Sequence, residues 1–295
     1  MRQLNFYEKV LNHIFNYYGE YLDDELYLQM RYRVVFGKKL NLESPQSFYE
    51  KIQWLKLHDR KPLYHDMADK YMAREYIKDK VGEEYLVPLV GHWNNAISVN
   101  EDELPESFVI KCTHDSQSVR ICKNKTEFDF DEMKSSFEKA LKKDYSRYGR
   151  EWAYRGIKPS VIAEELLTDE SGVELKDYKF FCFNGEPRII QVDYDRFVHH
   201  KRRIFDTSWN KIDVKITYDD DENKVIKRPE KFDEMMEISR TLSKNMAFLR
   251  VDLYYTDRIY VGELTFYPGG GFEPIVPYSC DLKWGEYLNL SNVGK

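Results

Sequence analysis

The 295-residue sequence predicts an α+β protein, and three observations favour this class. Helical periodicity fills much of the first 60 residues. From about residue 85 short strand patterns alternate with helical ones. Two pairs of strand patterns are each joined by a short polar turn, as in antiparallel hairpins. Strands, helices and antiparallel hairpins in one chain indicate α+β rather than a purely parallel α/β sheet.

The composition supports a packed core and narrows the function. Hydrophobic residues make up 42% and aromatic residues 15% of the chain, and the net charge is −6, which argues against a nucleic-acid binder. No apolar run is long enough to predict a transmembrane span. The four cysteines lack CxxC spacing, and we expect them to be reduced thiols of a cytoplasmic protein: Cys112, Cys122, Cys182 and Cys280.

The N-terminal region carries one strong helix-start signal, "SPQSFYEKIQWLKLHD" at 44–59. Pro45 suits a first-turn position, and Ser47 with Glu50 has the spacing of a capping box. Phe48, Ile52 and Leu55 recur at helical spacing and predict one buried face.

The rest of the chain divides into short elements. "SFVIKCTH" and "PSVIAEELL" predict strands, and residues 130–145 and 233–246 predict helices. "DYKFFCFNGEPRIIQVDYD" predicts a hairpin that turns at Asn184-Gly185, a strong short-range hairpin signal.

The second hairpin, residues 249–274, contains a carboxylate in the middle of each arm. If the turn centres on Asp257-Arg258, Thr256 pairs with Ile259 and Asp252 lies opposite Glu263. Opposed like charges are destabilising, so the pair needs an offsetting partner. A divalent cation with oxygen ligands would supply one. The alternative is a solvated face that tolerates two acids.

Other charged residues are weaker signals. Lys70 is near a helix start, and Lys111 ends a strand before a small polar loop whose N–H groups could bind phosphate. The alternative for Lys70 is a solvated helix face, and the alternative for Lys111 is an ordinary strand-to-strand turn with an extended lysine. Asp177 and Lys179 share a strand face, where a surface ion pair is the alternative to a site. The basic cluster 196–203 suits an anionic ligand, or is a solvated loop whose charges pair with nearby aspartates.

The order of these signals resembles the ATP-grasp superfamily of carboxylate–amine ligases. More closely, "RKPLYHDMADK", "IKCTHDSQSV", "LKDYKFFCFNGEP" and "GELTFYPGGGFE" resemble the TupA-like ATP-grasp family of teichuronopeptide biosynthesis. The resemblance implies an ATP-grasp fold in which two α+β subdomains with antiparallel sheets grip ATP. We expect a helical N-terminal segment over 1–62, the first subdomain over 63–160 and the second over 161–295.

The resemblance also implies roles for residues. Lys70 and Lys111 would hold phosphates, and the loop 115–118, with Ser116 and Ser118, would occupy the place of the lid. The adenine hinge would be Glu164, Glu165 and Leu167. Asp177 would bind ribose, and Lys179 would replace a family arginine. Arg250 would stabilise the transferring phosphoryl group. Asp252, Glu263 and Thr265 would ligate Mg²⁺, although the family usually has Asn where this chain has Thr265. The acceptor would be held by the following residues: Arg196, His200, Arg202, Gly269 and Gly270.

The implied reaction joins a uronic-acid carboxylate of a surface polysaccharide, or its precursor, to an amino acid. ATP activates the carboxylate as an acyl phosphate, with ADP as product, and Arg202 and Lys179 join Arg250 as catalytic candidates. Peripheral association with glycan assembly proteins at the inner face of the membrane stays open. Two alternatives remain: a glycosyltransferase of polysaccharide biosynthesis, or a non-catalytic nucleotide-binding partner.

Overall fold

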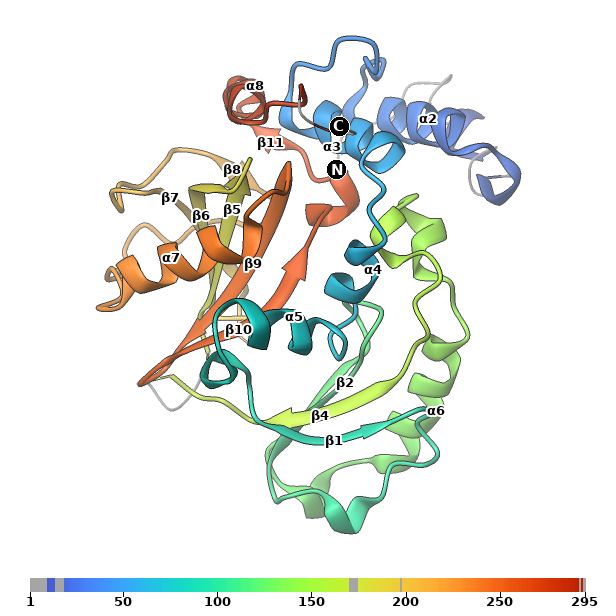
Figure 1. The fold of residues 1–295 in the computed structure, drawn as a ribbon, viewed down its shortest axis with the longest axis vertical. Coiled ribbons are helices and arrows are strands. Elements are labelled where there is room, and N and C mark those ends of the chain that lie inside the picture. Colours follow the sequence, from blue (N-terminus) through green and yellow to red (C-terminus); the bar gives the residue numbers. More distant parts are fainter. Residues whose placement is uncertain (1–9, 14–18, 170–174, 197, 292, 294–295) are drawn as a thin grey trace.

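The computed structural model describes residues 10–13, 19–169, 175–196, 198–291 and 293. Its strands form two main antiparallel sheets with a helical region at one end (Figure 1). The predicted α+β class is therefore confirmed. No helix in the described part of the chain is long and apolar enough to cross a membrane.

The N-terminal helices are short and locally capped. Ser47 accepts a hydrogen bond from the backbone N–H of Glu50, whose carboxylate in turn accepts from the Ser47 N–H, so the predicted capping box is present. Because Ser47 is the N-cap, Pro45 lies before the helix rather than in its first turn. The helices of this region are α2 (Asp24–Phe36), α3 (Phe48–His58), α4 (Leu63–Ala68) and α5 (Ala73–Lys80).

The first sheet has four strands in the order β1-β4-β2-β3, and α6 (Phe130–Leu141) packs against it. The strands are β1 (Leu89–Trp93), β2 (Phe108–Cys112), β3 (Val119–Cys122) and β4 (Val161–Glu165). β4 pairs with both β1 and β2, although it follows the division that we expect at residue 160. That domain division stays a prediction, but the first sheet itself includes residues up to Glu165.

The second sheet has five strands in the order β10-β9-β5-β6-β7. They are β5 (Asp177–Phe183), β6 (Glu186–Tyr194), β7 (Lys201–Asp206), β9 (Phe248–Tyr255) and β10 (Ile259–Thr265). The turn between β5 and β6 has positive φ at Asn184 and Gly185, as the sequence predicts. The last three residues of the basic cluster, 201–203, belong to this edge strand β7 rather than to a loop.

The remaining elements lie around this second sheet. The helix α7 (Phe232–Ser243) packs against β5, β6 and β9. A short 3₁₀ turn at Pro268–Gly271 follows β10, and then come β11 (Ile275–Val276) and α8 (Tyr278–Tyr287). β11 pairs in a two-stranded ladder with β8 (Lys215–Ile216), which lies between β7 and α7 in the chain.

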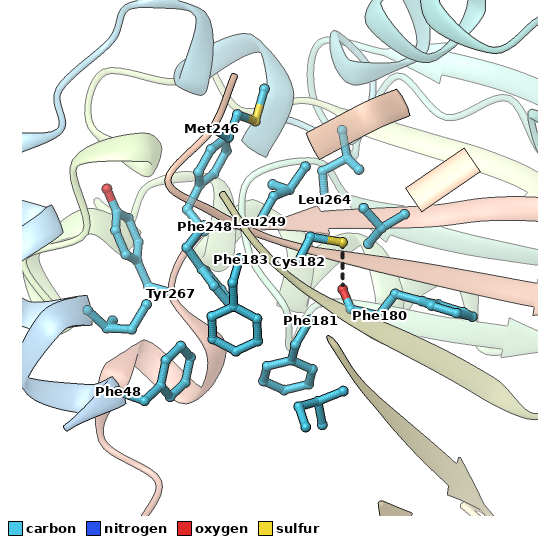
Figure 2. Packing of buried hydrophobic residues seen from close by; sticks show 14 of the residues in the cluster. Phe48, Phe180, Phe181, Cys182, Phe183, Met246, Phe248, Leu249, Leu264 and Tyr267 are labelled. Atoms are coloured by element: carbon cyan, nitrogen blue, oxygen red, sulfur yellow. Dashed lines mark hydrogen bonds between the residues drawn. The ribbon is translucent and has the colours of Figure 1, made fainter. Parts of the chain in front are cut away.

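The hydrophobic core has two parts. A small cluster lies between the four-stranded sheet and α6, and a large one joins the five-stranded sheet to the N-terminal helices. In the large cluster Phe48 of α3 packs edge-on against Phe183 and Phe248, with ring centroids 5.6 and 5.1 Å apart (Figure 2). Aromatic pairs at these distances add to the stabilisation from burial. The N-terminal segment thus shares the core of the second sheet, and α4 and α5 lie between the two sheets (Figure 1).

Candidate active site

The β9–β10 hairpin places the two predicted carboxylates opposite each other, but not by the expected register. Tyr255, not Thr256, pairs with Ile259, so the turn is one residue longer than the sequence suggests. A bulge at Gly262 then restores the alignment, and Asp252 faces Glu263. A Cβ on Gly262 would lie 2.5 Å from the Tyr254 ring, so a side chain at this position would require that ring to move.

Two cations offset the repulsion that the sequence predicts at Asp252. Arg250 grips the Asp252 carboxylate with Nε and Nη2, both at 2.7 Å, and Lys179 Nζ donates to Asp252 Oδ2 at 2.7 Å. Arg250 Nη2 also donates to Thr265 Oγ1 at 3.1 Å. Asp252 is only 2% exposed. Burial raises its pKa, but Arg250 and Lys179 outweigh burial and hold the pKa below its ordinary value.

Lys179 joins this group to the predicted ribose ligand. Its ammonium also bonds Asp177, and Arg196 Nη1 donates to the same Asp177 oxygen at 3.2 Å. Burial raises the pKa of Asp177, and its other oxygen, Oδ1, is buried with no hydrogen-bond partner in the described part of the chain. An oxygen in that state is ready to accept from a ligand hydroxyl.

The first sheet contributes a second charged group. Lys111 on β2 forms a 2.6 Å ion pair with Glu164 on β4, and Arg74 of α5 contacts the other Glu164 oxygen at 3.2 Å. All three side chains are mostly buried. Sequence reasoning missed Arg74, which lies on α5, four residues after Lys70.

Lys70 connects the two sheets. Its backbone N–H donates to Thr113 O at the end of β2, and its ammonium donates to the Asp115 carbonyl. The same ammonium lies 3.8 Å from Glu263 Oε1 on β10. Lys70, Arg74, Glu164 and Glu263 line a cavity of about 20 Å³, room for roughly one water molecule. The two halves of the predicted site therefore meet at Lys70.

The loop 115–118 is closed on itself. Asp115 Oδ1 accepts from the N–H groups of Gln117 and Ser118, and its Oδ2 accepts from the Ser118 hydroxyl at 2.6 Å. The Ser116 hydroxyl lies 2.7 Å from that of Tyr145. If the N–H groups of Gln117 and Ser118 bind phosphate, as predicted, their hydrogen bonds to Asp115 must first break.

The predicted hinge lies where β4 ends. Glu165 is exposed, its N–H donates to Pro88 O, and Leu167 is half-buried. Beside it is an open depression of about 530 Å³, which contains none of the phosphate-binding candidates. It is lined by Val90, Glu103, Leu104, Pro105, Ser107, Glu165 and Leu166.

Of the predicted acceptor residues, His200 and Arg202 lie at the β7 edge of the second sheet, at the other edge from β10. Arg202 is buried, and its guanidinium grips Asp193 at 2.6 and 2.9 Å. His200 stacks on Tyr218, with ring centroids 3.7 Å apart. Arg202 of the basic cluster 196–203 thus pairs with an aspartate, which is the alternative to binding an anionic ligand. Asp193 is one of the nearby aspartates with which that alternative pairs the cluster.

The glycine turn after β10 is held from α3. Gly269 and Gly270 both have φ near +60°, a conformation that L side chains rarely adopt. Lys56 donates to Gly149 O at 2.7 Å and also to Gly270 O, and Gln53 Nε2 donates to Gly271 O at 2.6 Å. The helical N-terminal segment therefore fixes the turn beside the predicted acceptor residues.

Comparison with known proteins gives the family. The profile of a family described as TupA-like ATPgrasp matches residues 50–289 of the 295-residue chain. The chain belongs to the TupA-like ATP-grasp family. This confirms the predicted resemblance and, with the two antiparallel sheets, the predicted fold. No curated protein matches the chain.

Solved structures similar to this TupA-like chain are distant. A D-alanine–D-alanine ligase from Bacillus anthracis in complex with ATP is 18% identical with a TM-score of 0.39, covering 68% of this chain and 53% of that one. Another structure of that ligase is 18% identical with a TM-score of 0.44, and the match covers 78% of this chain and 68% of that one. An N5-carboxyaminoimidazole synthase from Aspergillus clavatus is 11% identical with a TM-score of 0.39, and the match covers 70% of this chain and 46% of that one. The match thus spans about half the length of the first of these enzymes.

The side chains of this TupA-like protein fit Mg²⁺ bound with a nucleotide. Mg²⁺ is usually held by one or two carboxylates together with substrate phosphates. Asp252 and Glu263 supply two adjacent carboxylates, and the Thr265 hydroxyl lies beside them. In the described ranges no group of three or more His, Cys, Asp or Glu side chains could hold a metal ion by itself.

Proposed function

We propose that this protein is an ATP- and Mg²⁺-dependent ligase that forms an amide through an acyl phosphate. The observation that carries this proposal is the contact between Lys70 and Glu263, which joins the phosphate-binding candidates of one sheet to the metal-binding candidates of the other. Membership of the TupA-like ATP-grasp family supports it.

The proposed roles follow from charge and position. Lys70 and Lys111 bind ATP phosphates. The loop 115–118, with Ser116 and Ser118, takes the place of the lid. Glu164, Glu165 and Leu167 hold adenine. Asp177 binds ribose through its unpartnered oxygen. Asp252, Glu263 and Thr265 ligate Mg²⁺, which neutralises phosphate charge when bound.

The chain has cations where an acyl-phosphate reaction needs them. Lys179 is buried and Arg250 mostly buried beside Asp252, and binding of Mg²⁺ to Asp252 would release both for the transferring phosphoryl group. Preorganised cations of this kind stabilise developing negative charge without a protein nucleophile. Positioning of the two substrates supplies the rest of the catalysis.

For substrates, we propose a uronic acid of a surface polysaccharide or its precursor, and an amino acid. The acid would bind near Arg196, His200 and Arg202, next to the glycine turn at Gly269 and Gly270. The partly exposed Arg196 suits a carboxylate, whereas Arg202 orients the site through Asp193. A need for ATP places the reaction in the cytoplasm, where peripheral association with the membrane would bring it to a growing glycan.

A coupled ADP-release screen tests the proposal. Glucuronic and galacturonic acid are assayed with each amino acid and with hydroxylamine, which traps an acyl phosphate as a hydroxamate. We expect ADP, phosphate and hydroxamate with at least one uronic acid, and none with Asp252→Asn. AMP and pyrophosphate as products would move the protein to an adenylating class. Release of a nucleoside diphosphate from a sugar nucleotide would favour a glycosyltransferase.

A further inference from the structure

A carboxylate that no predicted role uses lies at the acceptor end of the site. Glu273 Oε1 accepts a hydrogen bond from the Thr217 hydroxyl at 3.1 Å. Thr217 directly follows β8, and Glu273 lies two residues before β11. These two strands pair through Ile216 and Ile275, so the small ladder fixes the contact.

The Glu273 side chain lies across the glycine turn. A Cβ built on Gly269 would be 2.2 Å from Glu273 Cγ and 2.5 Å from its Oε2. Gly269 itself is exposed and Glu273 half-buried, so solvent and ligands can reach this corner. The Glu273 side chain therefore occupies the space that a side chain on Gly269 would take, at the turn that follows the β9–β10 hairpin.

Thr217 is held in an unfavourable backbone conformation. Its φ is +61°, which is rare for a β-branched residue. Strain of this kind persists where the surrounding structure imposes it, often at ligand sites. Here the strained residue directs its hydroxyl at Glu273, which orients the carboxylate rather than neutralising it.

The charge of Glu273 lacks a direct partner. In the described part of the chain Glu273 forms no ion pair, and the nearby Arg202 is committed to Asp193 and to the Ile216 carbonyl. Burial lowers the pKa of Arg202 and Asp193 raises it. Glu273 raises it further by a smaller amount, so the charges of Glu273 and Arg202 lie within electrostatic range of each other. The corner therefore holds an oriented, accessible carboxylate with an unused oxygen.

We propose that Glu273 binds the ammonium group of the amine substrate, and that Thr217 is its positioning residue. This inference rests on the proposed ligase function and adds to it the site of the second substrate. A carboxylate recognises an ammonium through short, charge-assisted hydrogen bonds. Glu273 would then select a primary amine, such as an amino acid, and hold it beside the glycine turn where the activated acid is bound.

The test separates the two half-reactions. Glu273→Gln keeps an oxygen for the Thr217 hydroxyl but removes the charge. Wild-type and variant proteins are assayed with MgATP, the better uronic acid and glycine, L-glutamate or L-lysine, and in parallel with hydroxylamine, which is uncharged at neutral pH. We expect KM for the amino acid to rise about 10- to 100-fold, while hydroxamate formation and KM for MgATP stay within about twofold of wild type.

Matched variants sharpen the result. Glu222→Gln removes an exposed carboxylate that pairs with Lys211 nearby, and we expect it to change neither reaction. Thr217→Gly relieves the backbone strain but removes the hydroxyl, and we expect a smaller rise in KM for the amino acid with an unchanged melting temperature or a higher one.

Three outcomes would overturn the assignment. An unchanged KM for the amino acid in Glu273→Gln contradicts ammonium binding. An equal loss of hydroxamate formation in that variant shows that Glu273 serves the acid substrate or the fold. If the wild-type protein yields neither ADP nor hydroxamate with any acid, the ligase function itself is wrong, and this inference fails with it.

Discussion

Asp252 and Glu263 lie opposite each other across the β9–β10 hairpin, yet only Asp252 is enclosed by cations. Arg250 and Lys179 occupy both Asp252 oxygens, whereas Glu263 is partly exposed and has Lys70 at 3.8 Å. The two carboxylates are proposed to bind the same metal ion, but they should contribute differently to the free energy of unfolding, and this difference can be measured.

Asp252→Asn and Glu263→Gln should separate activity from stability. Both should lower turnover by on the order of 100-fold or more, because each removes a proposed Mg²⁺ ligand. Asp252→Asn should also lower the free energy of unfolding by about 3–5 kcal/mol, because it leaves the mostly buried Arg250 without its anion and Lys179 with Asp177 alone. Glu263→Gln, the control, should change it by under about 1 kcal/mol. Urea unfolding of both variants checks this, and equal stabilities would contradict the charge arrangement.

Mg²⁺ should bind with ATP rather than before it. A free ion must displace Arg250 and Lys179 from Asp252, whereas MgATP brings phosphates that give these cations new partners. MgATP at a hundredfold excess over Kd should stabilise the protein by about 2.7 kcal/mol, visible as a rise in melting temperature. MgCl₂ alone at the same concentration should produce little change. A comparable rise with MgCl₂ alone would show that the metal site forms without nucleotide.

Arg74 should act on ATP binding. Its contact with Glu164 helps to hold the Lys111 ion pair in place, so Arg74→Gln should weaken ATP binding by roughly 5- to 20-fold while kcat changes less. Arg74→Lys should recover part of the loss. Calorimetric titration with MgATP measures the effect independently of the acceptor. Arg228→Gln serves as control because Arg228 pairs with a largely exposed Asp233, and an equal loss in that variant would argue against a specific role.

The buried Asp281 should give the protein a pH-dependent weakness. Burial raises the pKa of Asp281 to about 6, although its Oδ1 accepts from the Tyr49 N–H. Between pH 4 and 6 the native protein thus holds a proton that the unfolded chain releases, so this group lowers stability as pH rises through that window, by roughly 2–3 kcal/mol in total. Asp281→Asn keeps the acceptor but cannot ionise.

The stability difference between Asp281→Asn and wild type should therefore grow in favour of the variant from pH 4 to pH 8. Comparing the two proteins at each pH cancels the titration of all other groups. Urea midpoints at both values check the prediction, and a variant that is equally destabilised at pH 4 and pH 8 would show that the carboxylate is needed in its ionised form.

The sequence by itself determined the local features and the order of the motifs. The capping box of Ser47 and Glu50 and the turn at Asn184-Gly185 can both be predicted from residues that are neighbours in the sequence. The first depends on local hydrogen bonds, and the second on which residues accept positive φ. The sequence also placed Asp252 opposite Glu263, although it did so with a turn that is one residue too short.

Only the tertiary structure decided which charges neutralise which. The bulge at Gly262, the grip of Arg250 on Asp252 and the contact of Arg74 with Glu164 depend on how strands pair and helices pack. Thr217 and Glu273 are 56 residues apart and meet only because β8 pairs with β11. Such contacts cannot be read from periodicity, because the free energy of burying a charge depends on which distant partner the fold brings to it.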